Sequence, residues 1–216
     1  MSKEDKEKIL RKVYYNEDGF GSIYETYKDA KKQLNSITLE DTKKWLEKQK
    51  GRQTKPYQGF NSYVADEPLE EIQIDIADFT RSAAENDGYR YCLVGVDVFT
   101  KILWGVPLKN KQPEECVRGF QEILNKIGKP KQIYHDNEGS FSSLKFIKIL
   151  NENNIRQIIV STKAPFAERA VQTIKNMIHA RIEGLDLDVE KWVDMLPAIL
   201  RKYNNTKHST TSVTPN

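Results

Sequence analysis

The stretch Ile72-Gln73-Ile74-Asp75-Ile76-Ala77-Asp78-Phe79 alternates apolar and polar residues, as a β-strand does. Asp75 lies inside this stretch, where an ionisable side chain is unexpected unless it has a partner. The pattern therefore predicts the first strand of a sheet and a candidate functional acid within it.

The segments that follow predict the rest of an α/β domain. Residues 89–98 are rich in β-branched and aromatic side chains and predict a central strand. Further strands are predicted at 102–108, 131–135 and 155–160, and helices at 113–128, 141–153, 164–182 and 189–203, the last kinked or broken near Pro197. An antiparallel meander followed by βαβ units predicts a mixed five-stranded sheet with helices on both faces.

Residues 1–62 have a different character and predict a small helical module. Residues 22–34 have apolar residues at helical spacing, and Thr38-Leu39-Glu40-Asp41 is typical of a capping box before a further helix. Residues 51–67 shift to Gly, Gln, Thr, Pro and Asn and predict a linker. We therefore expect an N-terminal helical module and linker at 1–62, and a larger domain at 63–216.

Charge is unevenly distributed between these two parts. Residues 1–62 contain 14 Lys and Arg against 10 Asp and Glu, and residues 63–216 contain 20 against 21. A basic module joined to a near-neutral domain is compatible with a polyanionic partner. A solvated lysine-rich helix and linker explains the same charges, and both interpretations are open.

The composition excludes several classes of protein. No apolar run reaches the length of a membrane span, and the N-terminus lacks the apolar core of a signal peptide. The two cysteines, Cys92 and Cys116, lie in apolar settings and are predicted to be buried thiols in a reducing compartment. With three histidines at unrelated spacing, they do not form a zinc-finger pattern.

Two further acids occupy positions comparable to that of Asp75. Asp136 directly follows the strand at 131–135, and Glu168 begins the helix after the strand at 155–160. Strands one and four are often neighbours in a sheet of this order, so the three carboxylates are expected to converge. Mg²⁺ or Mn²⁺ prefers such oxygen ligands, and two ions about 4 Å apart can hold a phosphodiester for in-line displacement.

The helix that begins near Glu168 has two distinct faces. Glu168, Gln172, Lys175 and His179 lie on one polar stripe at offsets of 0, 4, 7 and 11 residues. The apolar face contains Ala167, Ala170, Val171, Ile174, Met177, Ile178 and Ile182. Taken alone, this pattern also fits an ordinary amphipathic helix with a solvated face.

Five motifs in order resemble those of the retroviral-type (rve) DDE integrases, with most similarity to those of Maverick/Polinton transposons and virophages. The matching stretches are Gln73–Ile76, Val96–Lys101, Asp136–Phe141, Ala167–Lys175 and Tyr203–Ser209, the last followed by Pro215. The resemblance covers about residues 71–216. Val13–Asn16, Gly19–Gly21 and Trp45-Leu46 are similar to the N-terminal region of the transposon group.

The resemblance implies an RNase H-like fold and a DDE polynucleotidyl transferase. Its metal ligands map onto Asp75, Asp136 and Glu168, which would hold two Mg²⁺ or Mn²⁺ ions per active site. The implied function is DNA integration: 3′-end processing of viral or transposon DNA, then strand transfer into target DNA. A non-catalytic DNA-binding or assembly protein derived from such an enzyme, and an RNase H-like nuclease, are the alternatives.

The resemblance also implies partners and a location. Lys175, Arg169 and Gln172 match positions at or beside the family's DNA contacts, so the partner is double-stranded DNA, both element ends and target. Joining two ends requires two active sites, hence a homo-dimer or tetramer. Such a protein is intracellular, acts in the host nucleus and can be carried in a virion.

Other residues compete for these roles. Asp78 is the rival of Asp75 for the first ligand position, Asp97 has a structural role in the motif, and Glu138 is an auxiliary candidate or a solvated loop acid. His135 is a candidate support for Asp136 or a structural residue at the strand end. The 31 residues between Asp136 and Glu168 predict a short loop before the helix, which leaves open whether Glu168 is in place without metal or DNA.

Overall fold

The structure is a computed structural model that describes residues 3–49, 65–160, 164–188, 190–208 and 212–215. Its elements are α1 (Lys3–Tyr14), α2 (Ile23–Gln33), α3 (Leu39–Glu47), β1 (Glu71–Asp78), η1 (Thr80–Ser82), η2 (Ala84–Asn86), β2 (Tyr91–Asp97), β3 (Leu103–Leu108), α4 (Pro113–Ile127), β4 (Gln132–Asp136), α5 (Leu144–Glu152), β5 (Arg156–Val160), α6 (Pro165–Leu185) and α7 (Trp192–Asn204). Helix α7 continues through Pro197.

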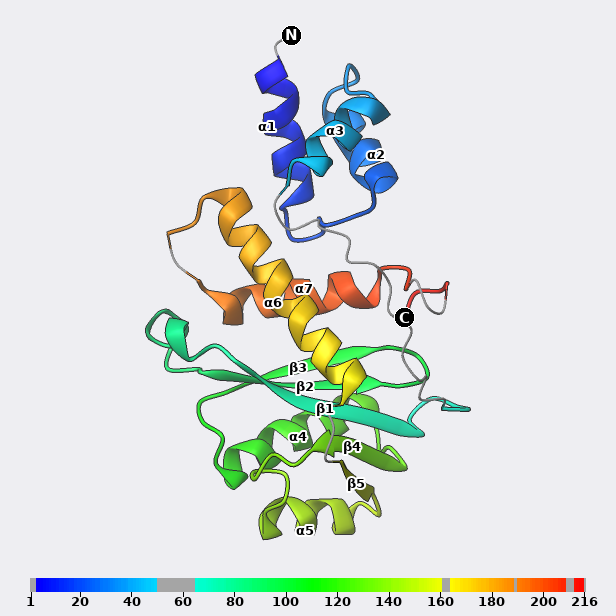
Figure 1. Cartoon of the computed structure of the whole chain (residues 1–216), viewed down its shortest axis with the longest axis vertical. Helices are drawn as coiled ribbons and strands as arrows, with labels where there is room; N and C mark the ends of the chain where they lie inside the picture. The colour runs from blue at the N-terminus through cyan, green and yellow to red at the C-terminus, as the bar shows by residue number, and fades with distance from the viewer. Residues whose placement is uncertain (1–2, 50–64, 161–163, 189, 209–211, 216) are drawn as a thin grey trace. The chain divides into compact units, whose positions relative to one another are not determined.

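The five strands form one mixed sheet in the order β3-β2-β1-β4-β5 (Figure 1). Strands β1, β2 and β3 are antiparallel neighbours, with η1 and η2 in the connection between β1 and β2. Strand β4 pairs in parallel with β1 and with β5, after the crossovers through α4 and α5. The predicted mixed five-stranded sheet is therefore confirmed, and β1 lies at its centre.

Alternation along β1 separates the two faces of the sheet. Ile72, Ile74 and Ile76 belong to the core with Phe120 of α4 and Phe146 of α5. Figure 1 shows α4 and α5 on this face and α7 with the first half of α6 on the other. The polar residues between the isoleucines therefore face α6, which is where a site can be assembled.

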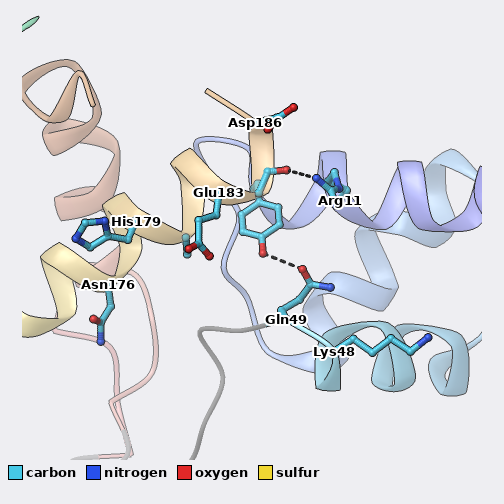
Figure 2. A pocket seen from close by; sticks show the side chains of 10 residues that line it. Arg11, Lys48, Gln49, Asn176, His179, Glu183 and Asp186 are labelled. Atoms are coloured by element: carbon cyan, nitrogen blue, oxygen red, sulfur yellow. Dashed lines mark hydrogen bonds between the residues drawn. The ribbon is translucent and has the colours of Figure 1, made fainter. Parts of the chain in front are cut away.

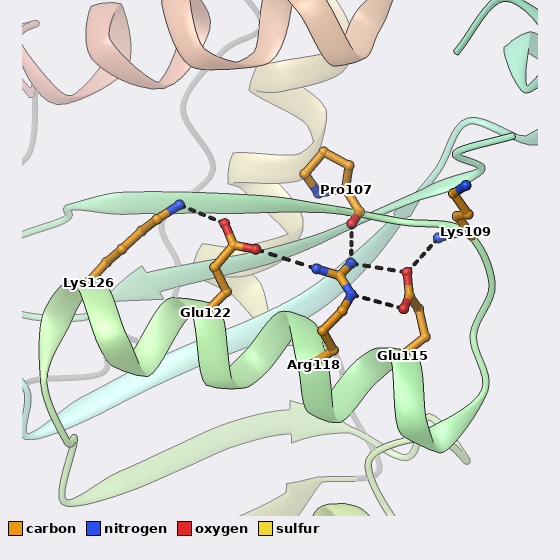
Figure 3. Close-up of polar contacts among 6 residues, drawn as sticks. All are labelled: Pro107, Lys109, Glu115, Arg118, Glu122 and Lys126. Atoms are coloured by element: carbon orange, nitrogen blue, oxygen red, sulfur yellow. Dashed lines mark hydrogen bonds and ion pairs between the residues drawn. The ribbon is translucent and has the colours of Figure 1, made fainter. Parts of the chain in front are cut away.

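The outer side of α4 is held to the sheet by polar contacts (Figure 3). The Arg118 guanidinium donates to the carbonyl oxygen of Pro107 at 2.7 Å and to the Glu115 carboxylate at 2.9 Å, and Glu122 links it to Lys126. Exposed ion pairs of this kind contribute about 0–1 kcal/mol each. Their effect is to fix the rotation of α4, with its apolar side toward the sheet.

Residues of the chain group into two compact units. One contains residues 1–61 with 176–189, and the other contains 62–175 with 190–216. Helix α6 contributes its first half to the sheet unit and its second half to the helical unit. The predicted boundary at 62 and residues 51–64 of the predicted linker lie outside the described residues.

Local hydrogen bonds define the starts of α2 and α3. The Thr38 hydroxyl accepts from Asp41 N at 3.1 Å, and the Asp41 carboxylate accepts from Thr38 N at 3.0 Å. Ser22 and Glu25 form the same reciprocal pair at α2. The capping box predicted at Thr38 is confirmed, and such caps contribute about 1 kcal/mol each.

Aromatic residues form the core of the helical unit. Tyr15 lies edge-on to Tyr14 and Trp45, with ring centroids 5.1 and 6.3 Å away. Arg181 of α6 is buried, lies over the Phe20 ring and donates to two backbone carbonyl groups of the α1–α2 connection. The second half of α6 therefore completes this core.

Gly184 packs directly against the Tyr15 ring, and Gly184→Ala is expected to destabilise the helical unit. A Cβ at position 184 would lie 2.4 Å from two ring carbons. Tyr15 cannot easily move, because its ring is buried and its hydroxyl donates to Gln49 at 3.0 Å. Overpacking costs about 1–3 kcal/mol, against about 1 kcal/mol gained in helix propensity.

Urea unfolding of the full chain tests the Gly184 contact. The matched control is Gly139→Ala, where a Cβ would meet no atom within 4 Å. A lower midpoint for the first variant and an unchanged one for the second is the expected result. A midpoint for Gly184→Ala at or above that of the unchanged chain would contradict the packing.

A polar hollow of about 710 Å³ lies in the helical unit (Figure 2). Arg11 and Lys48 contribute positive charges to its lining, and Glu183 and Asp186 contribute negative ones. Arg11 donates to the Gly184 carbonyl oxygen at 3.0 Å. Because the charges balance, this hollow gives no preference for a polyanion, and the predicted DNA-binding or assembly role of 1–62 stays a prediction.

The two cysteines are free thiols inside the sheet unit. Cys92 and Cys116 are both buried. Burial raises the pKa of Cys92 to about 12 and raises that of Cys116 as well. The prediction of buried thiols is confirmed.

Among the described residues, no helix combines the length and apolarity that crossing a bilayer requires.

Candidate active site

The parallel register of β1 and β4 brings Asp75 and Asp136 to the same level of the sheet. Gln73 pairs with Tyr134, and each aspartate lies two residues further along its strand. Since side chains alternate along a strand, both carboxylates lie on the face that carries Gln73 and Tyr134. The two acids therefore lie on neighbouring strands, each two residues beyond the last pair of the β1–β4 ladder.

The first turn of α6 is fixed on the same face, and it carries Glu168. Ala167 is fully buried against Tyr134 of β4. The backbone N–H of Phe166 donates to Gln73 Oε1 of β1 at 2.9 Å. Strand order and helix packing therefore bring the three predicted ligands into one neighbourhood.

The electrostatics of Asp75 record this convergence. Burial raises the pKa of Asp75, and the negative charges of Asp136, Glu168 and Glu138 raise it further. The hydrogen bond from Ile76 N at 2.7 Å opposes these effects. The negative charges of three other acids thus disfavour the ionised form of Asp75, and a bound cation would favour it.

Glu138 lies near Asp75 and forms an ion pair with a lysine. Its carboxylate lies 3.1 Å from Lys111 Nζ, which comes from the segment between β3 and α4. Ser140 Oγ donates to the Lys111 carbonyl oxygen at 2.6 Å and holds that segment against the loop after β4. Lys111 therefore pairs with Glu138, although the charge of Glu138 still contributes to the raised pKa of Asp75.

The acids fit a divalent cation in chemistry but are not preassembled. Within the ranges that the structure describes, no three His, Cys, Asp or Glu side chains are close enough together to hold an ion. Carboxylate oxygens are the ligands that Mg²⁺ and Mn²⁺ prefer. The raised pKa of Asp75 is the physical observation that fits such a cation.

The rival acids have other hydrogen-bonding duties. Asp97 is buried, and its carboxylate accepts from Leu69 N at 2.9 Å, Phe99 N at 2.7 Å and Thr100 N at 3.2 Å. Asp78 is exposed at the end of β1. Partial burial raises its pKa, but hydrogen bonds from Thr80 outweigh this and the net pKa is lowered. Both acids therefore stabilise backbone turns.

His135 supports the turn after β4 from inside the core. Its ring contacts the Asp136 carbonyl oxygen, packs 5.0 Å from the Phe141 ring and lies 2.9 Å from Gln157 Nε2. Burial lowers the pKa of His135 and favours the neutral imidazole. The ring thus lies on the opposite face of the sheet from the carboxylates.

The predicted DNA-contact residues follow Glu168 along α6. Arg169 and Gln172 are exposed, and Lys175 is half-buried. Lys175 Nζ lies 5.6 Å from the centre of the Phe79 ring, and its charge helps to lower the pKa of Asp78. Lys175 is therefore placed beside the end of β1, about two helical turns from Glu168.

Sequence reasoning missed three residues that shape this site: Gln73, Lys101 and Lys111. Gln73 belongs to the Gln73–Ile76 motif, but the motif assigns it no role. A polar residue in a strand buried on both faces must nevertheless have hydrogen-bonding partners. That signal could have identified it. Nothing in the spacing of Lys101 or Lys111 indicates that either side chain folds toward the site.

The sheet unit is similar to a known family of domains. Residues 66–165 match the model described as "Integrase core domain". The match contains β1 to β5, with Asp75 and Asp136, and ends at the first residue of α6. The sheet unit is therefore similar to integrase core domains, and Glu168 lies three residues beyond the matched range.

The sequence relatives are retrotransposon polyproteins. The chain is 28% identical over 176 residues to the Transposon Tf2-3 and Tf2-4 polyproteins of Schizosaccharomyces pombe. The matched part covers 77% of this chain but 12% of each relative's length. The relationship is thus distant and concerns a small part of those proteins.

Solved structures show the same fold. The magnesium complex of the HTLV-2 integrase catalytic core domain, in its trimeric form, has a TM-score of 0.56 and 21% identity, covering 68% of this chain and 94% of that one. The simian T-cell lymphotropic virus intasome in complex with the PP2A regulatory subunit B56 gamma has a TM-score of 0.63 and 17% identity, covering 85% and 64%. The predicted RNase H-like fold is confirmed.

Proposed function

We propose that this protein is a DNA integrase that processes the 3′ ends of viral or transposon DNA and transfers them into target DNA. The observation that carries the proposal is the convergence of Asp75, Asp136 and Glu168 on one face of an integrase core domain. As a DDE polynucleotidyl transferase, the chain uses water as the nucleophile in the first step. The DNA 3′ hydroxyl is the nucleophile in the second.

In this proposal Asp75, Asp136 and Glu168 hold two Mg²⁺ or Mn²⁺ ions. Bound ions of this kind polarise a phosphodiester and lower the pKa of a water or hydroxyl nucleophile. The donor set and the raised pKa of Asp75 support the assignment. The magnesium complex of the HTLV-2 catalytic core, a structure of the same fold, supports the choice of metal.

Lys175, Arg169 and Gln172 are proposed to contact double-stranded DNA, both element ends and target. Residues 1–62 act in DNA binding or assembly, and 63–216 form the catalytic unit. The proposal includes a homo-dimer or tetramer that acts in the host nucleus, because joining two DNA ends requires two active sites. A Maverick/Polinton or virophage source, with carriage in a virion, is the part of the proposal that rests on the sequence motifs alone.

A strand-transfer assay tests the proposal. The full chain is incubated with DNA duplexes carrying candidate element ends and a supercoiled plasmid, with Mg²⁺, Mn²⁺ or EDTA. We expect covalent joining of 3′ ends to the plasmid with either metal and none with EDTA. Binding of DNA without cleavage or joining would favour the non-catalytic alternative, and cleavage of an RNA–DNA hybrid without joining would favour a nuclease.

A further inference from the structure

Gln73 is a fully buried amide whose two ends connect three elements. Its Oε1 accepts from Phe166 N of α6 at 2.9 Å, and its Nε2 lies 3.3 Å from Glu71 Oε1. The other oxygen of Glu71 accepts from Gln132 Nε2 of β4 at 3.0 Å. A relay of hydrogen bonds therefore runs from β4 through β1 to the first turn of α6.

The amide that Gln73 accepts from is one that the helix itself leaves without a partner. The first intrahelical bond at this end runs from Glu168 N to the Ala164 carbonyl oxygen at 2.9 Å. The N–H groups of the preceding helical residues point out of the helix end. Gln73 thus caps α6 from a neighbouring strand.

Lys101 holds the same residue from the side of its ring. Its Nζ lies 3.8 Å from the centre of the Phe166 ring and donates to the Val98 carbonyl oxygen. Lys101 is only 6% exposed, an unusual placement for a lysine unless it serves a structural purpose. The contact joins the β2–β3 turn to the start of α6.

We infer that Gln73 and Lys101 are positioning residues that hold Phe166 and, through it, place Glu168 against Asp75 and Asp136. The inference rests on the proposed function, since it explains what positions Glu168 in the proposed metal site. Each helical residue advances by about 1.5 Å and turns by about 100°, so a slip of the first turn carries the Glu168 carboxylate away from both aspartates. Productive sites need their groups held within about 0.5 Å.

Mn²⁺ binding to the full chain, measured by electron paramagnetic resonance, tests the inference without relying on catalysis. The benchmark is Glu168→Gln, which removes one charged ligand. Gln73→Met removes the cap and is expected to weaken Mn²⁺ binding about 10- to 100-fold, as loss of a ligand-orienting hydrogen bond does. Lys101→Met keeps the apolar stem over Phe166 and is expected to weaken binding about 3- to 10-fold.

A double-mutant cycle separates positioning from a general effect on the fold. If Gln73 acts through Glu168, Gln73→Met adds no further loss of Mn²⁺ affinity in the Glu168→Gln background. Equal losses in both backgrounds, or no loss in either, would overturn the inference and leave the proposed function standing. If Glu168→Gln itself leaves Mn²⁺ affinity unchanged, the metal site and this inference both fail.

Two further variants guard against simple destabilisation. Gln132→Met breaks the other end of the relay and leaves the cap on Phe166, so we expect near-normal Mn²⁺ affinity. The exchange of Glu71→Gln with Gln73→Glu keeps an acceptor at position 73 and a donor at position 71, and should restore binding. If Gln73→Met does not fold, Gln73→Asn, which is too short to reach Phe166, replaces it in the cycle.

Discussion

Glu168→Gln is expected to lower the rate of strand transfer by about 10³-fold or more while leaving the fold intact. Metal ions supply several kcal/mol of charge stabilisation in phosphoryl transfer, and about 4 kcal/mol corresponds to 10³-fold in rate. The glutamine side chain has the same shape as glutamate but lacks the negative charge that, in the proposal, binds the metal ions together with Asp75 and Asp136. Because Glu168 is only half-buried, the substitution leaves the core unchanged.

The control for this variant lies on the same helix. Glu183→Gln changes an exposed glutamate in the second half of α6, within the helical unit, and should leave strand transfer unchanged. The measurement is the initial rate of joining at saturating Mg²⁺, with circular dichroism to verify the fold. Residual activity within tenfold of the unchanged chain would remove Glu168 from the mechanism.

Asp75→Asn is expected to abolish joining and, in the absence of metal, to stabilise the protein at neutral pH. The pKa of Asp75 is raised by burial and by the charges of Asp136, Glu168 and Glu138. Its ionised form is therefore the less favourable one in the folded chain. Removing the charge relieves that repulsion, and about 1 kcal/mol of relief corresponds to about 2–4 °C in Tm for a chain of this size.

The pH dependence has a definite sign. A group whose pKa is raised on folding contributes stability that is fully present below its ordinary pKa, near 3.8, and is lost as pH rises through the folded value. Asp75→Asn should therefore have its largest stabilising effect at neutral pH in EDTA. Mg²⁺ should raise the Tm of the unchanged chain more than that of the variant.

Asp78 provides the matched comparison, because its net pKa shift has the opposite sign. Hydrogen bonds from Thr80 outweigh partial burial there and lower the pKa, so the charge is stabilising at neutral pH. Asp78→Asn should leave Tm unchanged or lower it. Calorimetry of the three proteins from pH 4 to pH 8 in EDTA makes the test. A Tm for Asp75→Asn below that of the unchanged chain would contradict the interpretation that burial and neighbouring acids destabilise the Asp75 carboxylate.

The sheet could be predicted from the sequence because its signals are local. Alternation in β1, β-branched residues in β2, and the Pro113 and Gly128 boundaries of α4 all act within a few residues. Asp75 was also accessible, since an ionisable residue inside a strand is unexpected without a partner. The placement of Asp75 and Asp136 on neighbouring strands followed from the expected order of the strands.

The residues that position the site were harder to predict from the sequence, because their contacts join residues that are distant in the chain. Gln73 caps a helix 93 residues away, and Lys111 meets Glu138 across 27 residues. The second half of α6 joins the N-terminal helices through Arg181 and Gly184, whose partners are 165 and 173 residues away. An amphipathic pattern shows that a helix has an apolar face, but not which element covers it.

The burial of the two thiols has a practical consequence for testing the proposed DNA contacts of α6. With both cysteines buried, and the pKa of Cys92 raised to about 12, neither offers a thiolate to a reagent in solution at neutral pH. The unchanged chain is thus expected not to react in a disulfide-trapping experiment. A single exposed cysteine introduced by Gln172→Cys would react alone with thiol-modified DNA, and each crosslink would report the nucleotide beside that turn of α6.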